Sequence, residues 1–398
     1  MSQQKLNITF GILLLLDFIL LLFVSDSLSI SHKEVDIYYA DGRNILWYLT
    51  HLSTEIFGNN NIALRLPFVL FYISSVILAY ALTDDYFSRP IDRFISICIF
   101  MLLPGLNSAA LVLDSSIIVV FCTLLYLYLF KRFGKEYYIL LVLFLFIDNS
   151  FAILFLALFF YSLQKKDNTL LIISLLLFGI SMQMYGFEIG GRPRGYFIET
   201  FGIYASIFSP ILFLFFFYTL YRVGLKGERD LYWYIAFTSL GLSLLFSLRQ
   251  KVDVADFAPF VVIAIPLMVK LFLHSFRIRL KIFRRYHYTF AKVMLSILIL
   301  NLFVLLFNKP LYLVLQKNDK HFAYKYHGIY ELSQELKELH ILSVTCQNEK
   351  LQKQLEFYGV SKGNKYYLTI YKKDNYHDKI DIKYYDKLIK SYYLLLLK

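Results

Sequence analysis

Long apolar runs recur along the chain, beginning with ITFGILLLLDFILLLFV at residues 8–24. A run of this length can cross the roughly 30 Å hydrocarbon core of a bilayer as an α-helix. Hydrophobic residues make up 58% of the 398 residues, far more than a soluble domain of that length carries. The apolar segments lie at 8–24, 62–83, 94–104, 115–130, 137–147, 151–163, 169–183, 203–221, 231–247, 255–273 and 289–307. We therefore predict a mainly α polytopic membrane helical bundle with about 11 membrane segments.

The first apolar run resembles a signal peptide in its position but not in its details. It is long and Leu-rich, and no clear small-x-small cleavage site follows it. We therefore expect it to be a retained first helix.

The charge of the chain follows membrane topology. The formal net charge is +12, and the basic residues fall mainly in short loops between apolar runs and in the C-terminal tail. We therefore expect no nucleic-acid partner, because a nucleic-acid-binding protein gathers its basic residues on one face. Of the three cysteines, Cys98 and Cys122 lie in apolar runs and Cys346 stands alone in the tail, which predicts no disulfide framework and no clustered metal site.

Residues 137–163 are apolar but carry Asp148-Asn149-Ser150 in their middle. At about 1.5 Å per residue, each half crosses only part of the hydrocarbon core. One span would separate the basic residues before the segment from those after it, whereas a helical hairpin keeps both groups on one side, as the positive-inside rule prefers. We therefore predict two short helices, with Asp148 capping the second.

The loops then divide into a strongly basic set and a weakly basic set. The strongly basic loops hold Arg89, Arg93, Lys131, Arg132, Lys135, Lys165, Lys166, Arg222, Lys226, Arg229, Arg277, Arg279, Lys281, Arg284 and Arg285. The short loops on the other side hold Lys33, Arg43, Arg192, Arg194, Arg249 and Lys251. Because basic loops stay in the cytoplasm, we expect a cytoplasmic N-terminus, with residues 25–61, 184–202, 248–254 and those after about 308 outside.

The C-terminal tail is a different kind of sequence. HILSVTC (340–346) and KYYLTIYKK (365–373) are typical of strands, and EKLQKQLEFYG (349–359) between them is an amphipathic helix. The closing run SYYLLLLK is too short to span a membrane, so we expect a strand or a surface helix. We predict a transmembrane domain at 1–308 with an extracytoplasmic first loop at 25–61, and a small soluble α/β module at 309–398.

The first outside loop opens with SHKEVDIYYADGR at residues 31–43, where charged side chains surround a tyrosine pair. It continues as NILWYLTHLSTEIFG, which is amphipathic and aromatic enough to lie flat on a membrane surface. Carboxylates held at the lipid–water boundary suit a reaction on a lipid-borne substrate. Solvated loop charges remain the alternative for Glu34, Asp36 and Asp41.

This order of motifs resembles the C-type (GT-C) integral-membrane glycosyltransferases. The motifs are EVDIYYA, the amphipathic helix, IFGNNNIALRLPFVL and LVLDSSIIVVFCTLLYLYLFKR. They are similar to the branch that contains the lipid A aminoarabinose transferase and the protein O-mannosyltransferases (family 39). Residues that match this pattern are Glu34, Phe57, Gly58, Arg65, Leu66, Pro67 and Asp114. The family places Asp before the glutamate, whereas this chain has Lys33 there and a second carboxylate at Asp36.

The resemblance implies an enzyme of the bacterial inner (plasma) membrane that moves a sugar from a polyprenyl-phosphate-linked donor to an acceptor on the outer face. The acceptor would be lipid A, another membrane lipid, an envelope glycan or a protein. Glu34 or Asp36 would be the base that takes the acceptor's proton. The resemblance also gives Arg65 and Asp114 a role near the substrate, in competition with snorkelling for Arg65 and helix capping for Asp114.

The leaving phosphate requires cationic partners on the outer side. Arg192, Arg194, Arg249 and Lys251 are the basic residues of the other short outside loops, and arginine can grip two phosphate oxygens at once. Contact with anionic lipid headgroups is the alternative for all four.

Three further functions remain open beside the transferase. A transporter or flippase for a lipid-linked substrate would place ionisable residues along several spans. An O-acyltransferase would need a histidine at membrane depth, and all eight histidines fall in loops, run ends or the tail. A GT-C-like scaffold without activity would explain Lys33. Metal use differs between branches of the superfamily and no ligand spacing decides it, so a divalent cation stays open as cofactor.

Overall fold

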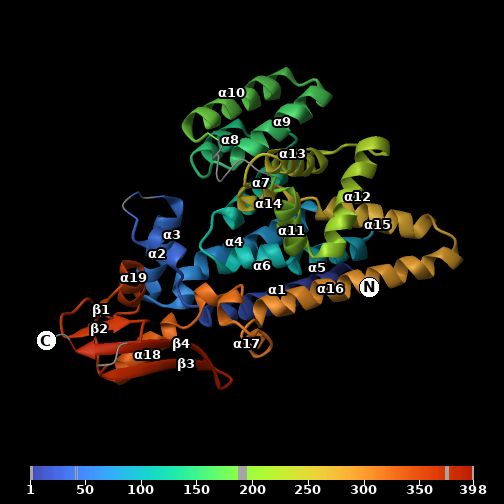
Figure 1. Ribbon diagram of the computed structural model, residues 1–398. Helices are drawn as coiled ribbons and strands as arrows, with labels where there is room; N and C mark the ends of the chain where they lie inside the picture. The colour runs from blue at the N-terminus through green and yellow to red at the C-terminus, as the bar shows by residue number, and fades with distance from the viewer. Residues whose placement is uncertain (1–2, 41, 43, 187–194, 373–375, 397–398) are drawn as a thin grey trace. The chain divides into compact units, whose positions relative to one another are not determined.

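The computed structural model describes residues 3–40, 42, 44–186, 195–372 and 376–396, most of them in helices (Figure 1). Four residues named above, Asp41, Arg43, Arg192 and Arg194, lie outside this part. Contacts divide the chain into two compact units. The first comprises Met1–Asp17, Leu70–Ala110 and Asp114–Leu302, and the second comprises Phe18–Val69, Leu111–Leu113 and Phe303–Lys398.

In the described residues of the first unit, the regular elements are helices. Its helices are α5 (Pro90–Met101), α6 (Pro104–Leu111), α7 (Ser116–Phe133), α8 (Tyr138–Leu145), α9 (Phe151–Lys165), α10 (Asn168–Met184), α11 (Phe197–Phe208), α12 (Pro210–Lys226), α13 (Leu231–Ser247), α14 (Val254–Val262) and α15 (Ile265–Ile278). Three long helices, α1 (Gln3–Asp26), α4 (Asn61–Leu82) and α16 (Lys281–Leu306), belong to it in part. Helix α9 packs along α10 and against α13, while α14 packs on α7 and α13 (Figure 1).

Several helices are long and apolar enough to cross a membrane. In the described residues these are α1, α4, α7 and α16, and the bent pairs α5–α6, α11–α12 and α14–α15 raise the number from 4 to as many as 7. Shorter apolar helices are α9, α10 and α13. The chain is therefore a polytopic helical protein as predicted, but the expected count of about 11 segments is not confirmed.

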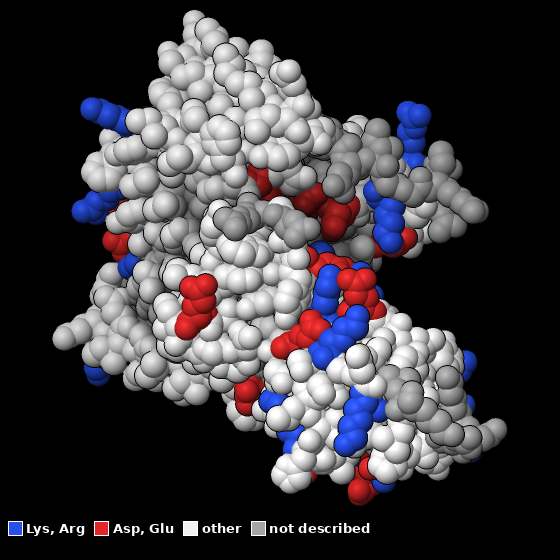
Figure 2. Space-filling model, turned by 90° about the vertical axis from the view of Figure 1, so that its left-hand side faces the viewer, with Lys and Arg blue, Asp and Glu red and all other residues white. Residues whose placement is uncertain are grey.

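The surfaces of these helices are those of a lipid-facing protein. On α1, Ile12, Leu15 and Leu16 are each more than half exposed, at 55%, 59% and 57%. Figure 2 shows broad areas of one face on which the described residues include no Lys, Arg, Asp or Glu. Exposed apolar surface of this extent is unfavourable in water and favourable in a bilayer.

The predicted break in residues 137–163 is confirmed. Helix α8 ends at Leu145 and α9 begins at Phe151. Asp148 accepts a hydrogen bond from the backbone N–H of Ser150 at 2.9 Å, so its carboxylate closes the turn that leads into α9. The expected capping of α9 by Asp148 is not observed, because the N-cap is Ser150, two residues later, and its side chain makes no capping bond.

The single acidic residue of the first apolar run also has a partner within the first unit. Tyr72 of α4, which is fully buried, donates its hydroxyl proton to Asp17 of α1 at 2.7 Å. A buried carboxylate without such a donor would be costly in an apolar environment. Asp17 therefore joins two helices through a polar contact.

The second unit combines short helices with the only strands of the described chain. Its elements are α2 (His32–Tyr38), α3 (Ile45–Phe57), α17 (Leu311–Val314), the 3-10 turns at Asn318–Lys320 and Tyr324–Tyr326, α18 (Ile329–Glu338), β1 (Thr345–Cys346), α19 (Glu349–Phe357), β2 (Tyr366–Thr369), β3 (Asp378–Tyr384) and β4 (Lys387–Leu396). The predicted helix is present as α19, and the predicted strands are present in part, because β1 covers only residues 345–346 of 340–346 and β2 covers 366–369 of 365–373. Residues 391–396 of the closing run lie in β4.

The four strands form one sheet in the order β1-β2-β4-β3. Strands β1 and β2 are parallel and are connected through α19, which is the crossover that parallel neighbours require. The other pairs are antiparallel, with Leu368 opposite Leu394 and Ile380 opposite Tyr392. These four side chains are buried and form the core of the α/β module together with Leu332, Leu336, Leu351 and Leu355.

Candidate active site

Helix α2 carries the two candidate bases, and its start is fixed by a local sequence signal. Ser31 is the N-cap, and its hydroxyl oxygen accepts the N–H of Glu34 at 3.4 Å. In return, the Glu34 carboxylate accepts the N–H of Ser31 at 2.8 Å. This reciprocal pair is a capping box, which satisfies two backbone donors that a helix start leaves free. The capping box also fixes the direction of the Glu34 side chain.

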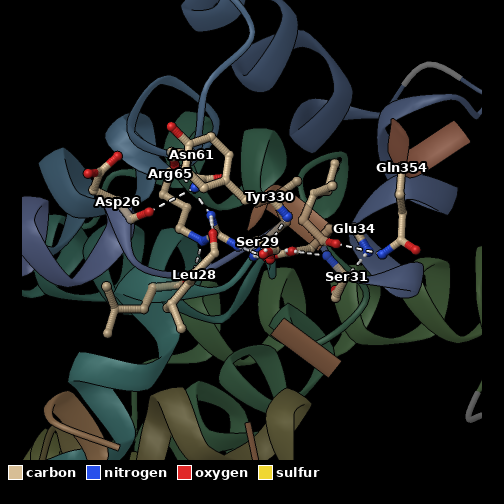
Figure 3. Close-up of polar contacts among 12 residues, drawn as sticks. Asp26, Leu28, Ser29, Ser31, Glu34, Asn61, Arg65, Tyr330 and Gln354 are labelled. Atoms are coloured by element: carbon tan, nitrogen blue, oxygen red, sulfur yellow. Dashed lines mark hydrogen bonds and ion pairs between the residues drawn. The ribbon is translucent and has the colours of Figure 1, made fainter. Parts of the chain in front are cut away.

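Glu34 and Arg65 form a buried ion pair (Figure 3). The Arg65 Nη2 atom lies 3.1 Å from Oε2 and 3.3 Å from Oε1 of Glu34, and both residues are 0% exposed. The backbone N–H of Leu113 donates to the same carboxylate at 3.3 Å. The carboxylate is therefore held by donors from three segments, the α2 cap, α4 and the chain just after α6.

The remaining donors of Arg65 form hydrogen bonds to backbone carbonyls. Its Nε donates to Leu111 at 2.8 Å, Nη1 to Leu28 at 2.8 Å and Asn61 at 3.3 Å, and Nη2 to Ser29 at 3.1 Å. Every guanidinium nitrogen thus has a partner inside the second unit. The guanidinium group of Arg65 therefore connects three segments by hydrogen bonds: the loop before α2, the first turn of α4 and residues 111–113.

The proline of the Arg65-Leu66-Pro67 motif also has a structural part in the second unit. Pro67 lies inside α4 and has no N–H, so the carbonyl of Ala63 loses its usual partner one turn later. The hydroxyl of Ser53, on α3, donates to that carbonyl at 2.6 Å. The motif therefore places α3 against the start of α4.

Asp36 has a different environment from Glu34. It lies on the exposed face of α2 and forms an ion pair with Lys350 of α19 at 2.5 Å, with both side chains 50% exposed. Burial, followed by the ammonium groups of Lys350 and Lys390, lowers the pKa of His32 on the same face of α2. The side of α2 that carries His32 and Asp36 therefore lies near two basic side chains of the C-terminal module, Lys350 and Lys390.

Asp114, Arg249 and Lys251 belong to the first unit. One carboxylate oxygen of Asp114 accepts the N–H of Ser116 at 3.0 Å and its hydroxyl at 2.5 Å, in the turn just before α7, whose N-cap Ser115 makes no side-chain capping bond. Arg249 is exposed, and Lys251 lies 3.4 Å from a carboxylate oxygen of Glu199 with both side chains largely exposed. The structure brings Glu34 and Arg65 together and places Asp36 two residues away on α2. Arg192 and Arg194 lie outside the described residues.

Sequence reasoning missed several residues of this site. The spacing of Ser31 and Glu34 is a capping-box signal that the sequence offers directly. Asn61, Tyr358 and Gln354 had no such signal, because their partners lie far away in the chain; Tyr358 and Asn61, for instance, are 297 residues apart. Within the described residues, no group of three or more His, Cys, Asp or Glu side chains is placed to hold a metal ion.

No family model matches the sequence, and no curated protein does either. Two solved structures of ArnT from Cupriavidus metallidurans match the fold, each covering 89% of this chain and 85% of theirs. The apo structure has a TM-score of 0.51 at 12% identity, and the structure bound to undecaprenyl phosphate has a TM-score of 0.50 at 11% identity. The chain therefore has the GT-C fold of ArnT.

Proposed function

We propose that the chain is a membrane glycosyltransferase of the family 39 type that moves a sugar from a polyprenyl-phosphate-linked donor to an acceptor outside the cytoplasm. The observation that carries this proposal is the GT-C fold shared with ArnT over 89% of the chain. One of the matching ArnT structures is bound to undecaprenyl phosphate, which supports a polyprenyl-linked donor here. A location in a bacterial inner membrane, with the C-terminal module outside, agrees with the distribution of basic loops.

The two carboxylates of α2 suit different roles. Glu34 is enclosed and its oxygens are occupied by donors from the protein, so it suits the task of holding Arg65 and the loop in place. Asp36 is half exposed and can meet an incoming acceptor once Lys350 moves aside. We therefore assign the base to Asp36, and the positioning role to Glu34 and Arg65.

The proposed reaction is a single displacement. The acceptor hydroxyl or amine loses its proton to the Asp36 carboxylate, and its oxygen or nitrogen forms a bond to the anomeric carbon of the sugar. The bond between that carbon and the phosphate oxygen breaks, and the phosphate keeps the electron pair. A phosphate is a stable leaving group, so one base suffices and no strong acid is required.

Cations must accompany the leaving phosphate. Arg249 and Lys251 are the described candidates because both are exposed, while Arg192 and Arg194 remain candidates from the sequence. Arg65 is an unsuitable direct ligand, because phosphate binding would require its buried contacts to open. Asp114 keeps a proposed role near the substrate alongside its bonds to Ser116.

The test is a mass-spectrometric comparison of lipid A, envelope glycans and glycopeptides from a deletion strain that carries the wild-type gene or one variant at equal membrane abundance. We expect one sugar to disappear on deletion and to return with the wild-type gene but not with Asp36→Asn. Asp319→Asn is the matched control, because Asp319 is an exposed carboxylate of the tail. If Asp36→Asn restores the sugar fully, Asp36 is not the base.

The main alternative is a GT-C-like protein without transferase activity, which Lys33 favours because the resembled family has Asp at that position. Under that alternative, deletion of the gene changes no glycan. Lys33→Asp provides a further discrimination: it should raise transfer if Lys33 merely weakens an active site, and it should change nothing in a scaffold.

A further inference from the structure

Helix α19 of the C-terminal module is attached to the loop that precedes α2. Ile30, the residue before the Ser31 cap, is fully buried and both of its backbone polar groups bond to α19 or its C-cap. Its carbonyl accepts from Gln354 Nε2 at 2.6 Å, and its N–H donates to the hydroxyl of Tyr358 at 2.8 Å. Both backbone polar groups of Ile30 therefore have their hydrogen-bond partners in α19 and its C-cap.

The hydroxyl of Tyr358 connects this loop to α4 as well. While it accepts from Ile30, it donates its own proton to Asn61 Oδ1 at 2.5 Å. Asn61 is the first residue of α4, its Nδ2 donates to the carbonyl of Asp26 at 2.8 Å, and its carbonyl accepts from Arg65. The Tyr358 hydroxyl thus bonds both to the loop that leads into α2, which carries Glu34, and to the start of α4, which carries Arg65.

Further bonds from the module support the same loop (Figure 3). The N–H of Tyr330 donates to the Ser29 hydroxyl at 3.0 Å, and the N–H of Ser29 donates to the carbonyl of Tyr326 at 2.8 Å. Residues 29 and 30 are therefore enclosed by the 324–330 segment and by α19. The carbonyl of Ser29 is itself a partner of Arg65.

The protonation state of Tyr358 suits this double role. Burial raises the pKa of the phenol, so the hydroxyl remains protonated across the physiological range and can donate to Asn61. Its ring packs edge-to-face with those of Phe357 and Tyr330, which fixes the direction of the hydroxyl.

We propose that Tyr358 is a positioning residue of the site: through Ile30 and Asn61 it holds the Glu34–Arg65 pair, and with it helix α2 and Asp36, in the geometry that transfer requires. This inference rests on the proposed function. It makes α19 a part of the active site and not an attachment to it. Tyr358 itself touches no reacting atom in this assignment.

The first arm of the test measures the loop directly and needs no substrate. Hydrogen exchange of residues 26–40 is compared between the full-length wild type and Tyr358→Phe in detergent micelles, with Tyr371→Phe as control because Tyr371 is 68% exposed. Tyr358→Phe keeps the ring and removes the two bonds, so we expect exchange at Ile30 and in α2 to rise by about tenfold. Unchanged exchange would overturn the proposal.

The second arm measures transfer with the donor that the mass-spectrometric comparison identifies. We expect Tyr358→Phe to lower kcat by about tenfold or more with little change in KM for the donor, because a misplaced base affects the transition state more than binding. Equal loss of donor affinity and of folded protein would indicate a merely structural role and would overturn the proposal. If the wild type transfers no sugar, the proposed function fails. The hydrogen-exchange measurement still shows whether Tyr358 holds the loop at Ile30.

A double-mutant cycle shows whether Tyr358 acts through Asn61. Asn61→Leu and Tyr358→Phe should each lower kcat, and the double variant should lose less than the sum of the two single effects, since both remove the Tyr358–Asn61 bond while each also removes one bond of its own. Fully additive effects would contradict this route. If Tyr358→Phe does not fold, Gln354→Met removes the other bond to Ile30 and should give the same faster exchange; an unchanged loop in that variant would overturn the proposal.

Discussion

At the scale of single residues, Glu34 and Arg65 match the motif of the resembled family, but both are enclosed by the protein's own hydrogen bonds. The pair matches the pattern of an active-site carboxylate and an arginine at the membrane surface, and the structure encloses both in one network of hydrogen bonds. A buried pair of this kind adds little net stability over apolar residues but becomes very costly when one partner is lost. The role of Glu34 is therefore measurable in stability as well as in activity.

We expect Glu34→Gln to destabilise the protein strongly, because Arg65 would remain buried with its charge uncompensated. The loss should be about 3–5 kcal/mol, and the double replacement Glu34→Met/Arg65→Met should cost less than the sum of its two single replacements, because it leaves no unpaired charge. Thermal unfolding in detergent measures both, with Glu335→Gln as an exposed control. A Glu34→Gln variant as stable as the control would contradict the buried ion pair.

Lys390 on β4 provides a prediction about pH. It donates to the carbonyls of His327 at 2.6 Å and Tyr324 at 3.3 Å, and burial lowers its pKa to about 8. The pKa of a lysine in an unfolded chain is about 10.4. Between pH 8 and that value the unfolded state therefore binds more protons than the folded state, and the free energy of unfolding rises with pH. Below pH 8 the cost of burying the charge is present in full.

The measurement is the difference in melting temperature between the wild type and Lys390→Met from pH 7.5 to 10. We expect the wild type to gain on the variant as pH rises, by at most about 1.4 kcal/mol per pH unit. Other titrating groups are common to both proteins and cancel in the difference. A difference that stays constant or falls with pH would show that Lys390 is charged throughout this range.

At the scale of elements, α3 is amphipathic in an unusual sense. Its Leu52, Ile56 and Phe57 are exposed at 59%, 66% and 58%, while Thr50 and Ser53 are buried at 0% and 6%. The buried hydroxyls find backbone partners, such as the carbonyl of Leu46 for Thr50. A helix that buries hydroxyls and exposes large apolar side chains suits a lipid surface.

We expect the apolar face of α3 to lie in the lipid headgroup boundary. Cysteines introduced at Leu52 and Ile56 and labelled with a polarity-sensitive dye should show blue-shifted emission in vesicles, because the dye enters an apolar environment. A label at Lys353, on a helix of the C-terminal module, is the control and should report water. Identical emission at all three positions would contradict this placement.

The sequence predicted elements unevenly, for physical reasons. The helix at 349–359 and the break at Asp148 came from periodicity and from a polar interruption, both of which are local signals. Helix α2 was missed because seven residues are too few for a periodic pattern, although the spacing of Ser31 and Glu34 marks its start. Strand β3 was missed although Ile380 and Ile382 alternate with polar residues, the pattern of a half-buried strand.

At the scale of the whole molecule, the GT-C fold was suggested by a few motifs and is supported by the likeness to ArnT. Membrane character follows from apolar runs alone, because only helices and closed barrels satisfy backbone groups in lipid. The number of spans could not be predicted in the same way, since bent pairs such as α11–α12, with 105° between them, leave the count open even in the structure. Long-range bonds such as those of Tyr358 have no local signature.

The topology predicts which loops are accessible from outside the cell. We expect a membrane-impermeant maleimide to label Lys362→Cys in intact cells but to label Lys226→Cys only after the membrane is opened, because the latter lies in a strongly basic loop. Cys98, Cys122 and Cys346 are replaced by alanine in both variants. Labelling of Lys226→Cys in intact cells would reverse the proposed orientation.

The strand order of the C-terminal sheet has a consequence for biogenesis. Strand β4 follows β3 in the chain but lies between β2 and β3, so the sheet cannot close until residues 387–396 have been synthesised. Tyr358 bonds to Ile30, which lies 328 residues earlier in the chain. Tyr358 is the C-cap of α19, and α19 packs against β1 of this sheet. During synthesis the loop before α2 therefore remains without the partners of Ser29 and Ile30 until residues 326–358 have been made, and we expect it to stay exposed in the nascent chain until then.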